Sequence, residues 1–220
     1  MSFVIKDDGG NRTPKELIPE DMHDAVCIGI ADLGTHTTVW EGKSKEQHKI
    51  NISWELPAVR DIGEDSDGKA YNRPRVSGKK FTISFHEKAT LRKWLERWRN
   101  KTFTKDELAG FDISVLVGKP CRLMFVHNEN NGKTYSNIDS IMKATPAMAG
   151  IQPESSTFCY SIEQDGTNFP ESMPEWMREV VMESREMAVA QSPAPAPANV
   201  PAAAPAVVNV TEDDADSIPF

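Results

Sequence analysis

Residues 79–98 read KKFTISFHEKATLRKWLERW, and the spacing of apolar residues changes halfway along this stretch. In the first half, Phe81, Ile83 and Phe85 alternate with polar residues, as in a β-strand that buries one face. In the second half, the apolar residues fall on one face of an α-helix and are Leu91, Trp94, Leu95 and Trp98. The stretch therefore predicts a strand over residues 79–86 and a helix over residues 88–100.

Two more strands are predicted before this stretch. Residues 23–33 are apolar and rich in β-branched side chains. Residues 47–56 alternate, with polar residues on one face and Ile50, Ile52, Trp54 and Leu56 on the other, and Pro57 is expected to end the strand. Residues 34–46 and 60–78 are expected to form long loops.

After the helix, the pattern predicts two strands joined by a tight turn. A short helix is expected over residues 105–109, ending at Gly110. Strands are expected over residues 119–128 and 133–144, because Asn131-Gly132 between them is a strong hairpin signal. Residues 157–164 are expected to add a strand, and a capping box from Ser172 to Glu175 to open a last helix.

Five strands with a helix between the third and the fourth is the element order of the OB-fold, a small Greek-key barrel. The sequence therefore predicts a mainly β domain over residues 22–187: a five-stranded OB-fold barrel with a C-terminal strand and helix. An unrelated α+β domain with the same element order stays open as the alternative.

Charge is distributed unevenly along the 220 residues, although the net charge is -8. Residues 75–105 hold ten basic and two acidic side chains, interleaved with aromatic residues. Residues 160–187 hold seven acidic and two basic side chains. The acidic total therefore does not exclude nucleic acid as a partner, because the basic block and the acidic segments are separate. A solvated basic face is the alternative interpretation of the block.

Both ends of the chain differ in composition from the predicted domain. Residues 1–21 are expected to form a polar arm. Residues 188–210 contain nine Ala and five Pro, which predicts a disordered linker because repeated Pro prevents helix and strand pairing. Residues 211–220 are acidic and end in an apolar tripeptide, which predicts a protein-interaction tip.

The last eight residues, DDADSIPF, resemble the acidic C-terminal tip of bacterial single-stranded DNA-binding proteins. In that family a Pro-rich or Gly-rich tail ends in several acids followed by Ile-Pro-Phe. Ser217 departs from the pattern, since it separates the acids from the tripeptide. The rest of the chain is similar to phage-encoded single-stranded DNA-binding proteins with a divergent OB-fold, in segments 31–35 and 132–141.

The resemblance implies a non-catalytic protein that coats single-stranded DNA in replication, recombination and repair, in the cytoplasm or in the host cytoplasm if the chain is phage-encoded. It also implies that the tip recruits partner enzymes. Phe220 would fill an apolar pocket while the acids meet Arg or Lys around it. The tip residues expected to bind partners are Asp213, Asp214, Asp216, Ile218, Pro219 and Phe220.

A surface for single-stranded DNA needs cations along the phosphates and exposed rings on which bases stack. In the predicted fold, such residues cluster in the first loop, near the connection of the second and third strands, and at the last hairpin. The candidates are Trp40, Lys43, Lys45, Lys49, Tyr71, Arg73, Arg75, Lys79, Lys80, Lys133 and Tyr135. Association into homo-oligomers stays open.

Enzymatic and metal-binding motifs are not found. The histidines have no ligand spacing, and three widely spaced cysteines favour neither a zinc site nor a disulfide framework. No cofactor, metal or membrane association is expected. Two alternatives remain: an OB-like adaptor that binds protein and not DNA, and a metal-dependent nuclease using the acidic loop at Asp61, Glu64, Asp65 and Asp67.

Overall fold

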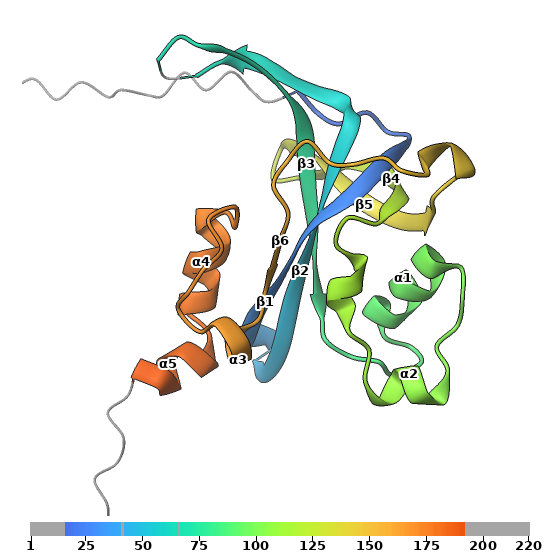
Figure 1. The fold of residues 1–220 in the computed structure, drawn as a ribbon. Helices are drawn as coiled ribbons and strands as arrows, with labels where there is room; N and C mark the ends of the chain where they lie inside the picture. Colours follow the sequence, from blue (N-terminus) through green and yellow to red (C-terminus); the bar gives the residue numbers. More distant parts are fainter. Residues whose placement is uncertain (1–15, 41, 66, 192–220) are drawn as a thin grey trace, which may run out of the picture.

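The computed structural model describes residues 16–40, 42–65 and 67–191. It is mainly β, with one sheet and helices on two sides of it (Figure 1). The strands are β1 (Met22–Trp40), β2 (Lys43–Glu64), β3 (Ala70–Thr82), β4 (Pro120–Asn130), β5 (Lys133–Lys143) and β6 (Phe158–Tyr160). The α-helices are α1 (Thr90–Arg99), α2 (Lys105–Ala109), α3 (Ile162–Asp165), α4 (Glu175–Met182) and α5 (Arg185–Gln191). Two 3₁₀ helices, η1 (Ile113–Leu116) and η2 (Pro146–Met148), complete the set in the described residues.

The sheet is organised around β1. Its strand order is β3-β2-β1-β4-β5, and every neighbouring pair in this order is antiparallel. Residues 22–26 of β1 pair with β4, and residues 29–31 pair in parallel with β6. The sheet is not closed into a barrel: among the described residues, no backbone pairing joins β3 to β5. The observed class is therefore a mainly β sheet with helices, as expected at that level.

One side of the sheet is closed by α1. Its predicted apolar stripe is confirmed, since Leu91, Trp94, Leu95 and Trp98 are all buried. The ring of Trp54 on β2 lies 5.9 Å from the ring of Trp98 and 6.4 Å from that of Trp94. The helix ends at Asn100, whose left-handed backbone (φ 51°) suits Asn better than most residues. We call this the α1 side.

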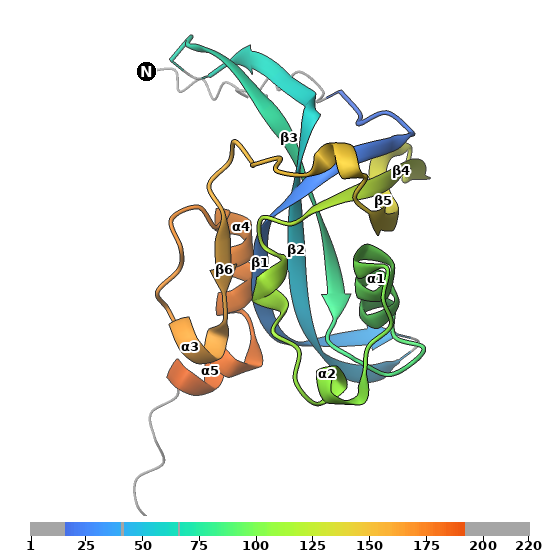
Figure 2. The same ribbon diagram turned by 45° about the vertical axis from the view of Figure 1, so that its right-hand side comes forward.

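The other side of β1 is covered by the C-terminal extension, residues 158–191. Ala31 and Leu33 of β1 pack there against β6 and against Met177 and Val181 of α4. Gly29 permits the close approach of β6, because a Cβ at this position would lie 2.3 Å from the ring of Phe158. We call this the α4 side. Figures 1 and 2 show α1 and α4 on opposite sides of the sheet.

The two predicted long loops are wrong, because both segments form antiparallel ribbons. Residues 35–40 pair with residues 43–48, extending β1 and β2. Residues 60–64 pair with residues 70–74, extending β2 and β3. Pro57 does not end β2: a register shift between Leu56 and Arg60 takes the proline out of the pairing, and the strand continues.

The remaining elements match the predictions in kind, with shifted ends. The helix over residues 105–109 and the hairpin at Asn131-Gly132 are confirmed, and both turn residues have positive φ. The third strand ends at Thr82, and the predicted strand over residues 157–164 is only the short β6 followed by α3. The predicted capping box is wrong. Helix α4 has Pro174 as its N-cap, and the Ser172 hydroxyl donates to the carbonyl of Thr157 and does not cap the helix.

Two predicted segments lie partly within the described residues. In the N-terminal arm, Ile18 is buried and its carbonyl accepts from Ser136. Helix α5 reaches Gln191, within the predicted linker. The rest of the linker and the whole predicted tip lie outside the described residues.

Candidate nucleic-acid interface

A groove of about 500 Å³ separates the β1–β2 ribbon from the segment that joins β3 to α1. Most of its side chains are basic or polar, beside the apolar Phe81 and Ala89, and they come from two parts of the chain. Its charged and polar lining includes Lys45, Gln47, Lys80, Thr82, His86 and Lys88. Within the described residues, no acidic side chain lines the groove. We call it the lysine groove.

The alternation of side chains along β2 and β3 explains why Lys45, Lys49 and Lys80 lie on one face of the sheet. Lys49 is the cross-strand partner of Thr82, and Asn51 is the partner of Lys80, so alternate residues of both strands point the same way. Lys45 lies on the same face of β2 as Lys49. Glu46 alternates to the other face, where its carboxylate accepts from Arg185 at 2.6 Å. The carboxylate of Glu46 therefore points to the face of the strand opposite to Lys45.

Lys79 and Lys80 are adjacent in sequence but lie on opposite sides of the sheet. The Lys79 ammonium donates to the carbonyl of Ile138 on β5 at 2.7 Å and lies 4.9 Å from the ring centre of Trp94. Partial burial lowers the pKa of Lys79. Lys80 is exposed on the α4 side. Lys79 therefore bridges β3 and β5, and only Lys80 contributes to the lysine groove.

Trp176 is a candidate residue that the sequence analysis did not select. Its ring is 43% exposed on α4, and the Lys80 ammonium lies 5.0 Å from the ring centre. The helical pattern placed Trp176 with the apolar residues of its helix, yet Met177 and Val181 are the buried ones. No local signal places α4 beside β3, because that contact depends on the tertiary structure. His86 and Lys88 were also missed, since residues 83–89 were expected to continue the strand and start the helix.

The other predicted residues lie outside the lysine groove. Tyr71 and Arg73 belong to the β2–β3 ribbon, at the opposite end of β2 from Lys45, and Arg75 pairs with Leu56 just before the ribbon. The Arg73 guanidinium stacks 4.5 Å from the ring centre of Tyr71, and Arg75 donates to the carbonyl of Glu16.

Three further candidates are exposed at strand ends. Lys133 and Tyr135 lie at the β4–β5 turn, and Lys43 at the tip of the β1–β2 ribbon. Trp40 ends β1, and its side chain is outside the described set. Of the predicted residues, Lys45 and Lys80 therefore line the lysine groove, together with Lys88. Lys49 shares their face of the sheet without lining the groove, and the rest lie elsewhere.

Three further observations on the described residues concern metal clusters, cysteine thiols and membrane spans. They contain no group of three or more His, Cys, Asp or Glu side chains placed to hold a metal ion. Burial raises the pKa of the Cys27 thiol to about 12, which disfavours the reactive thiolate. No helix among these residues is long and apolar enough to cross a membrane. The chain matches no protein-family model, and no curated protein compared with it is significantly similar.

Proposed function

We propose that the protein is a non-catalytic binder of single-stranded DNA that tolerates any sequence, with the lysine groove and Trp176 as its primary contact. The single observation that supports this most directly is the groove itself: three lysines without a lining carboxylate, next to an exposed indole ring. Lysines neutralise phosphates whatever the base, and every base has a face that stacks on an aromatic ring.

We also propose that the domain is an OB-fold whose barrel is completed through side chains. Three features support it: β1 is shared between β2 and β4, α1 lies between β3 and β4 in the chain, and Lys79 bridges the open seam to Ile138. OB-folds bind oligonucleotides across the face of strands 2 and 3, which here carries Lys49 and Lys80.

For the C-terminal tip, the proposal rests on the sequence DDADSIPF. An apolar end preceded by acids fits a pocket lined by cations on a partner enzyme. Replication and repair enzymes are the proposed partners, and the cytoplasm is the proposed location. Deleting residues 211–220 is expected to leave DNA affinity equal or higher while abolishing partner capture.

The decisive experiment is a titration of the full chain with unlabelled oligo-dT, monitoring tryptophan fluorescence and strand integrity at two salt concentrations. Salt-sensitive quenching without cleavage is expected. Absence of binding would favour the adaptor function, and Mg²⁺-dependent cleavage would favour the nuclease. A parallel titration with oligo-U tests RNA, since stacking and phosphate contacts do not discriminate between the sugars.

Substitution of the two adjacent lysines sharpens this experiment. Lys80→Gln is expected to weaken binding and to reduce the salt slope by about 1, because one phosphate contact is lost. Lys79→Gln should leave the slope unchanged, since its ammonium is bound on the α1 side. Lys119→Gln, an exposed lysine outside the groove, is the matched control. Equal slopes for Lys80→Gln and Lys119→Gln would place the DNA elsewhere.

A further inference from the structure

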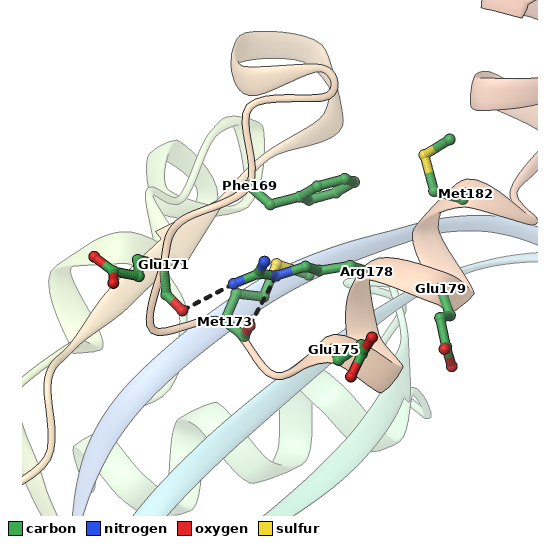
Figure 3. Close-up of a pocket in the computed structure, with 7 residues that line it drawn as sticks. All are labelled: Phe169, Glu171, Met173, Glu175, Arg178, Glu179 and Met182. Atoms are coloured by element: carbon green, nitrogen blue, oxygen red, sulfur yellow. Dashed lines mark hydrogen bonds between the residues drawn. The ribbon is translucent and has the colours of Figure 1, made fainter.

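A pocket on the α4 side combines apolar and acidic side chains. It has a volume of about 610 Å³ and lies between α4 and the segment that precedes it (Figure 3). Phe169 and Met182 supply its apolar surface, and Figure 3 shows the Phe169 ring on the same side of Arg178 as Met182. Three carboxylates surround it, from Glu171, Glu175 and Glu179. We call these five residues the α4 surface.

The one basic residue of this pocket is already bound within the chain. The Arg178 guanidinium donates to the carbonyls of Met173, Pro170 and Glu171 at 2.8–2.9 Å. The carboxylates of Glu175 and Glu179 are exposed. The α4 surface therefore presents negative charge around an apolar centre, which suits a cationic partner with an apolar side chain.

A surface of the opposite kind lies on the other side of the molecule. Two adjoining hollows run along the outer face of α1 and the end of β5 and share Arg97 and Asn100. Met142 is 52% exposed there. The surrounding cations are Lys93, Arg97 and Lys143, whereas the ammonium of Lys101 is already paired with the carboxylate of Glu107 at 3.3 Å. We call these cations and Met142 the α1 surface.

Glu96 also lines one of these hollows, but its carboxylate is paired within the chain. The Glu96 carboxylate accepts from Arg92 at 3.0 Å and from the backbone N–H of Phe103 at 3.3 Å. The α1 surface therefore presents positive charge around an apolar methionine. It complements the α4 surface in charge, and both have an apolar centre.

The two surfaces cannot meet within one molecule, because the sheet lies between them (Figures 1 and 2). The alternation of β1 confirms the separation: Ile30 belongs to the core on the α1 side, and Ala31 to the core on the α4 side. Two copies, however, can bring them together. A contact between two different surfaces of identical chains is heterologous, and it propagates in one direction unless it closes into a ring.

We propose that the α4 surface of one copy docks on the α1 surface of a second copy, so that the protein associates head to tail. The occupant is assigned by charge complementarity and by the matching apolar centres. Neither surface contains a residue that lines the lysine groove. The proposal does not depend on DNA binding and is tested without nucleic acid.

The test is a charge exchange in the full-length chain, measured by sedimentation equilibrium at low and high salt. One variant reverses the α4 surface with Glu175→Lys and Glu179→Lys, and the other reverses the α1 surface with Lys93→Glu and Arg97→Glu. Wild-type protein is expected to gain average mass with concentration at low salt and to lose it at high salt. Each variant alone should remain monomeric, because both of its surfaces then carry the same sign.

An equimolar mixture of the two variants is expected to associate again, since each reversed surface then meets an opposite one. The matched control for the α4-reversed variant, Glu129→Lys with Glu163→Lys, makes the same change in net charge at exposed positions outside both surfaces and should associate like wild type.

Three outcomes would overturn the proposal: monomeric wild-type protein at every concentration in low salt, association that persists in the α4-reversed variant, or no recovery in the mixture. Circular dichroism verifies that each variant is folded. If a double variant does not fold, Glu179→Lys and Arg97→Glu repeat the exchange with one charge each.

Discussion

The two sides of the sheet are closed by different physical means. On the α1 side, aromatic rings from β2 and α1 pack on one another, and the contact is almost entirely apolar. On the α4 side, a smaller apolar cluster is supplemented by carboxylates that bind backbone N–H groups. The comparison shows that the periodicity of a sequence predicts apolar packing but does not predict hydrogen bonds between buried carboxylates and the backbone.

Two glutamates illustrate the α4 side. Glu55 on β2 is fully buried, and its carboxylate accepts from the backbone N–H groups of Glu154 and Ser155 at 2.9 and 2.7 Å. Glu186 on α5 accepts from the N–H and the hydroxyl of Thr35 at 2.8 and 2.6 Å. The Glu55 bonds attach the segment that leads into the C-terminal extension to β2, and the Glu186 bonds attach the extension itself to β1. The extension therefore depends on a few polar contacts in addition to its apolar cluster.

The largest effect is expected on the α1 side. Trp54→Ala removes the ring that contacts both Trp94 and Trp98, and should lower the free energy of unfolding by about 3–5 kcal/mol. Urea denaturation measures the loss. Met177→Ala, in the smaller cluster, is the companion variant and should lose less. A larger loss for Met177→Ala would reverse the energetic order of the two sides.

The next effect tests the buried carboxylate. Glu55→Ala leaves two backbone N–H groups without their acceptor, which costs about 2–3 kcal/mol when both stay buried. Hydrogen exchange at Glu154 and Ser155 should accelerate more than exchange in α1. The control is Glu163→Ala, an exposed carboxylate with no such role in the extension. Unchanged protection at residues 154 and 155 would contradict this function of Glu55.

A third prediction separates binding from packing on the α4 side. Trp176→Ala should weaken oligo-dT binding by about 1–3 kcal/mol, the range for a stacked base. Trp176→Phe should retain most of the affinity, because a ring remains. Met182→Ala removes an exposed apolar side chain from the same helix and serves as the control. Equal affinities for Trp176→Ala and Met182→Ala would exclude stacking on Trp176.

The smallest expected effect is a pH dependence of the stability with which the C-terminal extension docks on β1. Burial raises the pKa of Glu186, but the hydrogen bonds from Thr35 and the charge of His48 outweigh it and lower this pKa to about 2. Because the pKa of Glu186 is lower in the folded state, its ionised carboxylate adds to the free energy of unfolding above the ordinary pKa of 4.5. This contribution is lost as the pH falls toward 2.

Hydrogen exchange in α5 measures this dependence. Protection in the wild-type helix should decline between about pH 4.5 and pH 2, and Glu186→Gln should already be weaker at neutral pH and vary less over that window. Identical pH profiles for the two proteins would show that Glu186 does not anchor α5.

The comparison of the two sides also explains which elements could be predicted. Helix α1 and the strand pattern of Ile50, Ile52, Trp54 and Leu56 follow from periodicity, because one face of each is buried. The ribbons at residues 35–48 and 60–74 could not be found, since both of their faces include polar residues and their strands are defined by pairing. Asn51, Ser53 and Glu55 looked solvent-facing in the pattern, yet all three are buried.

The sequence by itself determined the mainly β class, the position of the helix between the third and fourth strands, the hairpin at Asn131-Gly132 and the separation of charge along the chain. These depend on local spacing and turn chemistry. Only the tertiary structure decided that Lys79 bridges to Ile138 on β5 and that Trp176 lies beside Lys80. The physical reason is that strand pairing and the docking of α4 bring together residues far apart in sequence, and no local pattern encodes such contacts.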